Sequence, residues 1–95
     1  MHADITYKVP KGKLLRLSLE YDTTILHHCK MCGDFFIHPE ETIHEMEHAL
    51  YRLPVEASES RIRELLDRAV ERKGAQLIGI NTESIAKLIH EAIVQ

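Results

Sequence analysis

The sequence is short of the residue types on which several classes of protein depend. Its 95 residues include no tryptophan, 4 glycines, 3 prolines and 2 cysteines. Two cysteines are too few for a disulfide framework and are compatible with a reducing compartment. No apolar run approaches the roughly 20 residues of a membrane-spanning helix, and residues 1–8 lack the apolar core of a signal peptide. We therefore expect one soluble, cytoplasmic domain over residues 1–95, with no membrane partner.

The charge balance is slightly acidic. The chain has 12 Lys and Arg against 15 Asp and Glu, a net charge of -3, which argues against nucleic-acid binding as its main task. A core of this size also leaves little room for a deep active-site cavity. The sequence contains neither a Gly-rich phosphate loop nor a nucleophile-elbow motif. We therefore expect no active site in this chain by itself.

Alternating apolar and polar residues predict three strands at the start of the chain. The strands are expected at residues 3–9, 15–21 and 25–33. Turn-forming residues 10–12 and a short connection at 22–24 separate them. In the third strand we expect Ile25, His27, Cys29 and Met31 to share one face.

The apolar period then becomes that of amphipathic helices. The first is expected over residues 39–53, the second from Ser58 or Ser60 to a cap at Gly74, and the last from Asn81 to Val94. Strands followed by helices predict an α+β fold, in which a three-stranded antiparallel sheet is followed by three helices packed on one face.

The segment His44-Glu45-Met46-Glu47-His48 matches the H-E-x-x-H pattern of zinc hydrolases. On a helical wheel, however, His44 and His48 lie opposite the apolar stripe and therefore face solvent. No histidine in residues 49–59 offers the third ligand that catalytic zinc needs. The pattern therefore favours an exposed helix over a metal site.

The cysteines form a C-x-x-C pair, which is half of many structural zinc sites. The other half is missing from the sequence. On a strand, Cys29 and Cys32 project from opposite faces, so they cannot share a metal or a disulfide. We expect Cys29 to be buried as a small hydrophobe and Cys32 to be partly exposed.

Basic residues gather in two places. On the second helix they alternate with acids, which is typical of a solvated face. Around the first hairpin, Lys8, Lys11, Lys13 and Arg16 have no acidic neighbours and lie on a loop, where function concentrates. This cluster is either a binding surface or a plain surface turn.

Both phenylalanines stand side by side, at Phe35 and Phe36. In an extended segment adjacent side chains point in opposite directions, so only one ring can enter the core. The other is expected to pack under the hairpin or to be presented to a partner. Asp34 is expected to bond backbone groups of the turn.

Two segments resemble one protein family. They are Lys8-Val9-Pro10-Lys11-Gly12-Lys13-Leu14-Leu15-Arg16 and Gly33-Asp34-Phe35-Phe36-Ile37-His38-Pro39-Glu40-Glu41. They look like the K-V-P-x-G-K-L-x-R and G-D-F-F signatures of the accessory C-terminal domain of lipoate-protein ligases. Residues 81–86 look like the start of that family's final helix.

The resemblance implies a function in protein lipoylation. In most bacterial ligases the accessory domain is fused behind a catalytic domain, whereas a stand-alone chain resembles the small subunit of the bipartite archaeal enzymes. This chain would then be non-catalytic alone and would bind no cofactor. A larger catalytic subunit would bind ATP, Mg²⁺ and lipoate and form lipoyl-adenylate. The lipoyl acceptors would be acyltransferase subunits or the glycine-cleavage H protein.

The resemblance also suggests site residues. Lys13 is the candidate that reaches toward the adenylate, because a flexible cation can screen phosphate charge. The expected partner interface consists of Lys8, Val9, Pro10, Lys11, Gly12, Arg16, Gly33, Asp34, Phe35 and Phe36. Two alternatives stay open: a small zinc-binding protein or metallohydrolase that uses His44 and His48, and a nucleic-acid-binding module that uses the basic hairpin.

Overall fold

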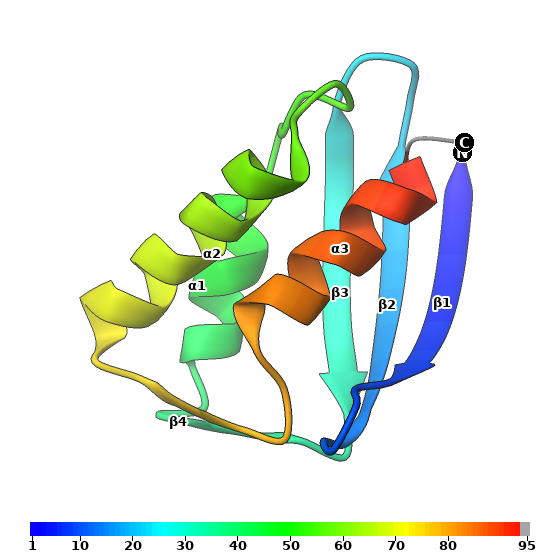
Figure 1. Ribbon diagram of the computed structural model, residues 1–95. Coiled ribbons are helices and arrows are strands. Elements are labelled where there is room, and N and C mark those ends of the chain that lie inside the picture. Colours follow the sequence, from blue (N-terminus) through cyan, green and yellow to red (C-terminus); the bar gives the residue numbers. More distant parts are fainter. Residues whose placement is uncertain (94–95) are drawn as a thin grey trace.

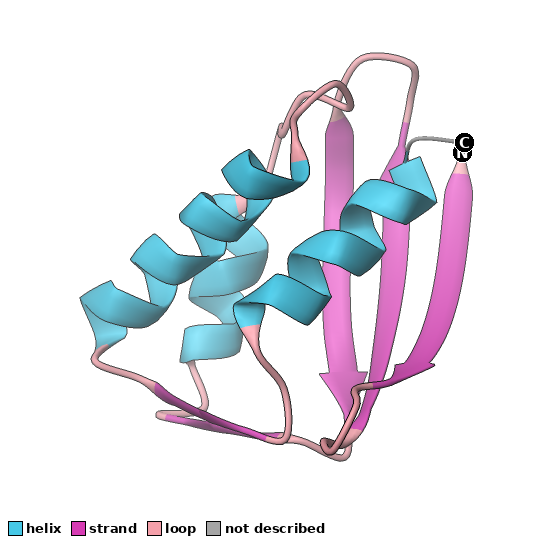
Figure 2. Cartoon of the chain, viewed as in Figure 1, coloured by secondary structure: helices cyan, strands magenta, loops and turns pink. Residues whose placement is uncertain are grey.

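The computed structural model describes residues 1–93 and has an α+β fold. Three strands form an antiparallel sheet in the order β1-β2-β3, and three helices cover one of its faces (Figure 1, Figure 2). The strands are β1 (His2–Lys8), β2 (Leu14–Tyr21) and β3 (Leu26–Gly33). The helices are α1 (Thr42–Ala49), α2 (Glu59–Lys73) and α3 (Thr82–Ile93). The predicted fold class is therefore confirmed.

The central strand supplies the most deeply buried row of the sheet. Leu15, Leu17 and Leu19 of β2 are at most 2% exposed, as their alternation with polar residues predicts. Leu17 lies opposite Ile5 of β1 and Met31 of β3. This register places the apolar face of all three strands toward the helices.

Strand β3 starts with an irregularity that changes which residues face the core. The pairing of β3 with β2 shifts next to His27, which is therefore the extra residue of a β-bulge. Leu26 thus turns to the core with Cys29 and is fully buried, whereas His27 is exposed. The prediction that Ile25 and His27 share a face with Cys29 is wrong, because strict alternation does not continue through a bulge.

Helix α1 is shorter than the predicted segment 39–53. It begins at Thr42, and Arg52 has a left-handed backbone with φ of 64°, so the helix cannot continue to Leu53. The carbonyl of Leu53 instead accepts a hydrogen bond from the backbone N–H of Leu26 at 2.7 Å. The backbone of Leu53, which the apolar period assigned to the first helix, therefore pairs with the edge of the sheet.

The starts of the other two helices and the end of α2 are as the capping residues predict. The Ser58 hydroxyl accepts a backbone N–H bond in the first turn of α2, and Gly74 ends this helix in the left-handed conformation. Asn81 caps α3 by accepting the N–H of Ser84 at 2.7 Å. Val94, the predicted end of the last helix, lies outside the described residues.

A short ribbon was not predicted from the sequence. Strands β4 (Phe36–His38) and β5 (Gln76–Ile78) pair in antiparallel fashion and form a second, two-stranded sheet. A strand of three residues is too short for an alternation to be recognised. The ribbon links the segment after β3 to the segment before α3.

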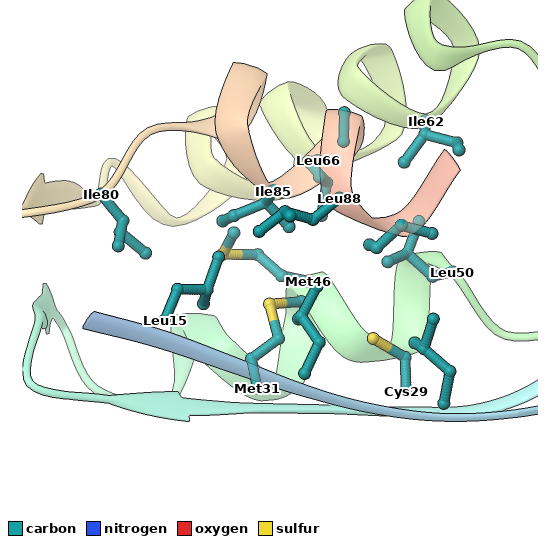
Figure 3. Packing of buried hydrophobic residues seen from close by; sticks show 14 of the residues in the cluster. Leu15, Cys29, Met31, Met46, Leu50, Ile62, Leu66, Ile80, Ile85 and Leu88 are labelled. Atoms are coloured by element: carbon teal, nitrogen blue, oxygen red, sulfur yellow. The ribbon is translucent and has the colours of Figure 1, made fainter. Parts of the chain in front are cut away.

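Side chains from the sheet and the helices meet in a common core. Figure 3 shows Leu15 and Met31 of the sheet facing Met46, Leu66 and Ile85 of the helices, and each of these is at most 3% exposed. Burial of a large apolar side chain contributes about 1.5–3 kcal/mol, so this layer holds the helices on the sheet. In the described part of the chain, no helix combines the length and the apolar character needed to cross a membrane.

Candidate partner-binding surface

The two segments that resemble the ligase domain come together at one end of the molecule. The β1–β2 loop and the residues after β3 lie at the same end as β4, at the bottom of Figure 1. The backbone N–H of Asp34 donates a hydrogen bond to the carbonyl of Leu14 at 3.1 Å. A Cβ atom at Gly33 would lie 2.1 Å from the same carbonyl oxygen, so this approach requires glycine. The fold therefore joins both segments directly.

A third segment, which the sequence did not single out, fixes the tip of the hairpin. The backbone N–H of Lys13 donates to the carbonyl of Gly79 at 2.7 Å. A Cβ at Gly79, whose φ is 88°, would lie 2.4 Å from Cγ of Lys13, and a Cβ at Gly12 would lie 2.5 Å from the Gly79 oxygen. Two glycines thus allow close contact between the hairpin and the β5–α3 connection. The need for glycine at residue 79 is visible only in the folded chain, where this residue contacts the hairpin.

Val9 differs from the other residues of the predicted interface. Its side chain is only 2% exposed and belongs to the core, while Pro10 and Lys11 beside it are exposed. The Val9 carbonyl also accepts the N–H of Gly12 at 2.8 Å, which closes the turn. Val9 therefore supports the hairpin from inside, and its side chain is not available to a partner.

The hairpin cations form no ion pairs. Lys8, Lys11, Lys13 and Arg16 are exposed, and so is Lys30 of β3. Across residues 1–93, none of them forms an ion pair. They therefore form a patch of positive charge on a chain whose net charge is negative.

Elsewhere the charges are balanced locally. On α2, Glu64 forms ion pairs of 2.7 Å with both Arg61 and Arg68, which fits the predicted solvated face. On the uncovered sheet face, the His2 ring contacts the carboxylates of Asp4 and Glu20, which raise the pKa of His2, and Asp4 also lines the groove that contains Arg16 and Lys30. The cluster of cations without ion pairs is thus a property of the hairpin and its surroundings.

The two phenylalanines behave as their adjacency predicts. Phe35 packs against the core, whereas Phe36 is 67% exposed. Between β3, β4 and α1 lies an open groove of about 360 Å³ whose lining includes Phe35, Phe36, Cys32, Glu40 and Ile43. An exposed aromatic ring beside an apolar groove is typical of a binding surface.

The ribbon places a second apolar side chain beside Phe36. Ile78 of β5 is the direct cross-strand partner of Phe36 and is 49% exposed, so both side chains point to the same side of the ribbon. Ile37, next along β4, points the other way and is buried. No local pattern predicts this pair, because Phe36 and Ile78 are distant in the chain.

Two residues of the H-E-x-x-H segment, His44 and Glu47, point in different directions. The His44 side chain is 81% exposed, as the helical wheel predicts. Glu47 instead turns inward, and its Oε2 accepts a hydrogen bond from the backbone N–H of Met31 at 2.8 Å on the edge of β3. In the described residues, no group of three or more His, Cys, Asp or Glu residues is arranged to hold a metal.

The cysteines lie as predicted. Cys29 is buried and Cys32 is exposed, and both are free thiols. Burial and the nearby Glu47 carboxylate raise the pKa of the Cys29 thiol to about 12. Cys32 lines both the groove beside Phe36 and a second groove on the uncovered sheet face, which also includes Arg16 and Lys30. The two grooves therefore meet at Cys32.

Comparison with known proteins identifies a shared fold. No family model and no curated protein matches the sequence. A solved chain from the structural analysis of an archaeal lipoylation system of Thermoplasma acidophilum, comprising a bi-partite lipoate protein ligase and its E2 lipoyl domain, is similar at 23% sequence identity. The match covers 94% of this chain and 97% of that chain, with a TM-score of 0.71. The two chains therefore have the same fold.

Proposed function

We propose that this chain is the accessory subunit of a bi-partite lipoate-protein ligase. A larger subunit would bind ATP, Mg²⁺ and lipoate and form lipoyl-adenylate, and it would need this chain for that step. Lipoyl acceptors such as acyltransferase subunits or a glycine-cleavage H protein would be substrates of the complex. The fold shared with a chain of an archaeal lipoylation system supports this proposal.

One observation carries the proposal further than the shared fold. The two segments that resemble the ligase domain are separate in sequence, yet the Asp34 N–H to Leu14 carbonyl bond of 3.1 Å joins them. Exposed cations and exposed apolar side chains surround this junction. Surfaces of this mixed character are suited to binding another protein.

Lys13 is the residue we propose to lie nearest the adenylate. Its backbone is fixed by the 2.7 Å bond to Gly79, and its side-chain stem lies against that glycine. A lysine whose backbone is held in this way can extend its flexible side chain, with the ammonium group at its end, toward a phosphate. Complex formation would thereby bring a positive charge to the active site of the partner.

Lipoate-dependent exchange of pyrophosphate into ATP tests the proposal. The candidate larger subunit from the same source would be assayed alone, with this chain, and with the Lys13→Ala variant. We expect exchange to appear or to rise at least tenfold on addition of this chain. Equal exchange with and without the chain, by a larger subunit that is otherwise competent, would contradict an accessory role. Unchanged exchange with Lys13→Ala would contradict only the role of Lys13.

The same mixture also tests whether the chain is instead a lipoyl acceptor. After incubation with ligase, ATP and lipoate, intact-mass measurement would detect one added lipoyl group on an acceptor. We expect the mass of this chain to stay unchanged while that of an acceptor domain in the same tube increases. A lipoylated lysine in this chain would replace the accessory proposal with an acceptor function.

A further inference from the structure

We propose that the exposed pair Phe36 and Ile78, together with the adjoining groove and the hairpin cations, forms the docking surface for an acidic protein partner. The partner would present an apolar socket for Phe36, flanked by carboxylates. We call this region the ribbon surface. The identification of that partner as the larger ligase subunit rests on the proposed function, whereas the chemistry of the surface does not.

The apolar centre of the ribbon surface is preformed. Phe36 is 67% and Ile78 is 49% exposed, and their direct cross-strand pairing holds the side chains next to each other. Beneath them, Ile37 is buried in the core and fixes the strand. A rigid exposed aromatic beside a groove has the features of a hot spot, since it can bury a large area at low entropic cost.

The charged rim indicates the chemistry of the partner. Lys13 borders the ribbon surface through its contact with Gly79, and Lys11 lies beside it in the hairpin. Arg16 and Lys30 line the groove that meets this surface at Cys32, together with Asp4, whose carboxylate pairs with His2. Because these cations form no ion pair within residues 1–93, carboxylates of a binding partner can pair with them without displacing existing ion pairs.

A second copy of this chain fits this surface poorly. A two-fold dimer through the ribbon surface would bring the same patch of each copy together. The cations around Lys11 and Arg16 would then face their own equivalents, and like charges at an interface are repulsive. A partner of opposite charge avoids this repulsion.

Nucleic acid is also disfavoured as the occupant. The groove beside Phe36 is lined mostly by apolar side chains and by no cation, so it offers nothing with which a phosphate backbone could pair. An apolar socket in a protein partner can instead bury Phe36 and exclude water from the apolar lining of the groove.

Matched variants at the two ends of the molecule test the docking surface. Tyr51 and Arg52 follow α1, next to the start of β3 and therefore remote from the ribbon. Tyr51 is 58% exposed, which makes Tyr51→Ala the control for Phe36→Ala. Arg52 is an exposed cation with φ of 64°, close to the 58° of Lys11, so Arg52→Glu is the control for Lys11→Glu.

The affinity of each variant for the larger subunit would be measured by calorimetry and its association rate by stopped-flow mixing, with thermal unfolding as a check on folding. We expect Phe36→Ala to weaken binding at least tenfold. Lys11→Glu should slow association at least threefold at low salt, with the difference shrinking at high salt. Tyr51→Ala and Arg52→Glu should bind as the wild-type chain does. Equal binding by Phe36→Ala and Tyr51→Ala, or absence of binding by the wild-type chain, would overturn the proposal.

Cys32 provides a measurement that needs no variant. Its thiol lies in the groove beside Phe36, whereas Cys29 is buried and does not compete for a maleimide reagent. We expect the bound partner to slow alkylation of Cys32 at least fivefold. An unchanged rate in the saturated complex, or protection by single-stranded RNA or by self-association in place of the partner, would overturn the proposal.

The binding and exchange assays separate the two proposals. If the chain binds through Phe36 but does not stimulate pyrophosphate exchange, the docking surface holds and the accessory function at adenylation fails. If exchange is stimulated equally by the wild-type chain and by Phe36→Ala at limiting concentration, the function holds and the docking surface fails.

Discussion

The backbone N–H of Lys13 donates a hydrogen bond to the carbonyl of Gly79 at 2.7 Å, and the Lys13 side chain occupies the space that a Cβ at residue 79 would fill. The hairpin between β1 and β2 is therefore attached to the connection before α3. Because Lys13 is the residue that we propose to act nearest the adenylate, the position of its ammonium group depends on a glycine in a different part of the chain.

The first prediction concerns this contact. Gly79→Ala combines a φ of 88° with a Cβ placed 2.4 Å from Cγ of Lys13, so we expect it to destabilise the fold by about 2–4 kcal/mol. Gly74→Ala is the control, because residue 74 is also left-handed but its Cβ would meet nothing within 4 Å. It should cost about 1–2 kcal/mol. Urea unfolding measures both, and an equal loss for the two variants would mean that the close approach of Lys13 to residue 79 leaves room for a Cβ atom.

The second prediction separates the two glutamates of the H-E-x-x-H segment. Glu47 is 20% exposed in its side chain and accepts the N–H of Met31 at 2.8 Å. Glu47→Ala should cost about 1–3 kcal/mol, because a partly buried donor loses its partner. Glu45→Ala removes only a 3.8 Å ion pair to Arg72 between exposed side chains and should cost at most about 0.5 kcal/mol.

Urea unfolding of the two variants provides the measurement, and hydrogen exchange locates the effect. The Met31 amide should exchange faster in Glu47→Ala than in Glu45→Ala. In a zinc hydrolase, Glu45 would be the glutamate required for activity, since it occupies the position of the general base in that motif. Loss of a hydrolytic activity in Glu45→Ala would therefore contradict our assignment of this helix to a structural role.

The third prediction concerns the thiols. The pKa of Cys29 is raised to about 12, so at pH 8 only about one in ten thousand Cys29 side chains is a thiolate, the form that reacts. Cys32 is exposed. We expect intact-mass measurement to detect a single maleimide adduct on the native chain, located on Cys32 by peptide mapping, and two adducts in denaturant. Rapid labelling of both thiols in the native chain would show that β3 opens readily.

The fourth prediction concerns acid stability. Backbone N–H groups of Ile25 and Thr24 donate to the Asp22 carboxylate and hold its pKa below the ordinary value of 3.8. A lowered folded-state pKa stabilises the fold above the unfolded value, and this contribution is lost as the pH falls below 3.8. Urea unfolding should therefore show a smaller decrease in stability for Asp22→Asn than for the wild-type chain as the pH falls from about 6 to about 3. Parallel decreases would contradict the assigned role of Asp22.

Local signals predicted most of the fold. The alternation around Leu17 and the caps Ser58 and Gly74 each act over a few residues, and the structure has them as expected. The predictions that were wrong depended on long-range contacts. Helix α1 ends early because Leu53 pairs with the start of β3, and the bulge at His27 turns Leu26 inward.

In the candidate surface, too, local signals predicted some features, whereas others depend on long-range contacts. The adjacency of Phe35 and Phe36 predicts that one of the two rings is exposed, which the structure shows to be Phe36, and the excess of cations on the hairpin is visible in the sequence. Gly79 and Ile78 carry no such local signal. Their contacts exist only because the ribbon brings β5 beside β4 and because the β5–α3 connection meets the hairpin.

The fixation of the hairpin also bears on the rate at which a partner can bind. One backbone hydrogen bond joins Lys13 to Gly79, and a second joins Asp34 to Leu14. The loops that carry the exposed groups are thus already ordered in the free chain, so little conformational entropy remains to be lost on association. Docking should then proceed by single-exponential kinetics whose rate rises linearly with partner concentration, without a slow folding step after encounter.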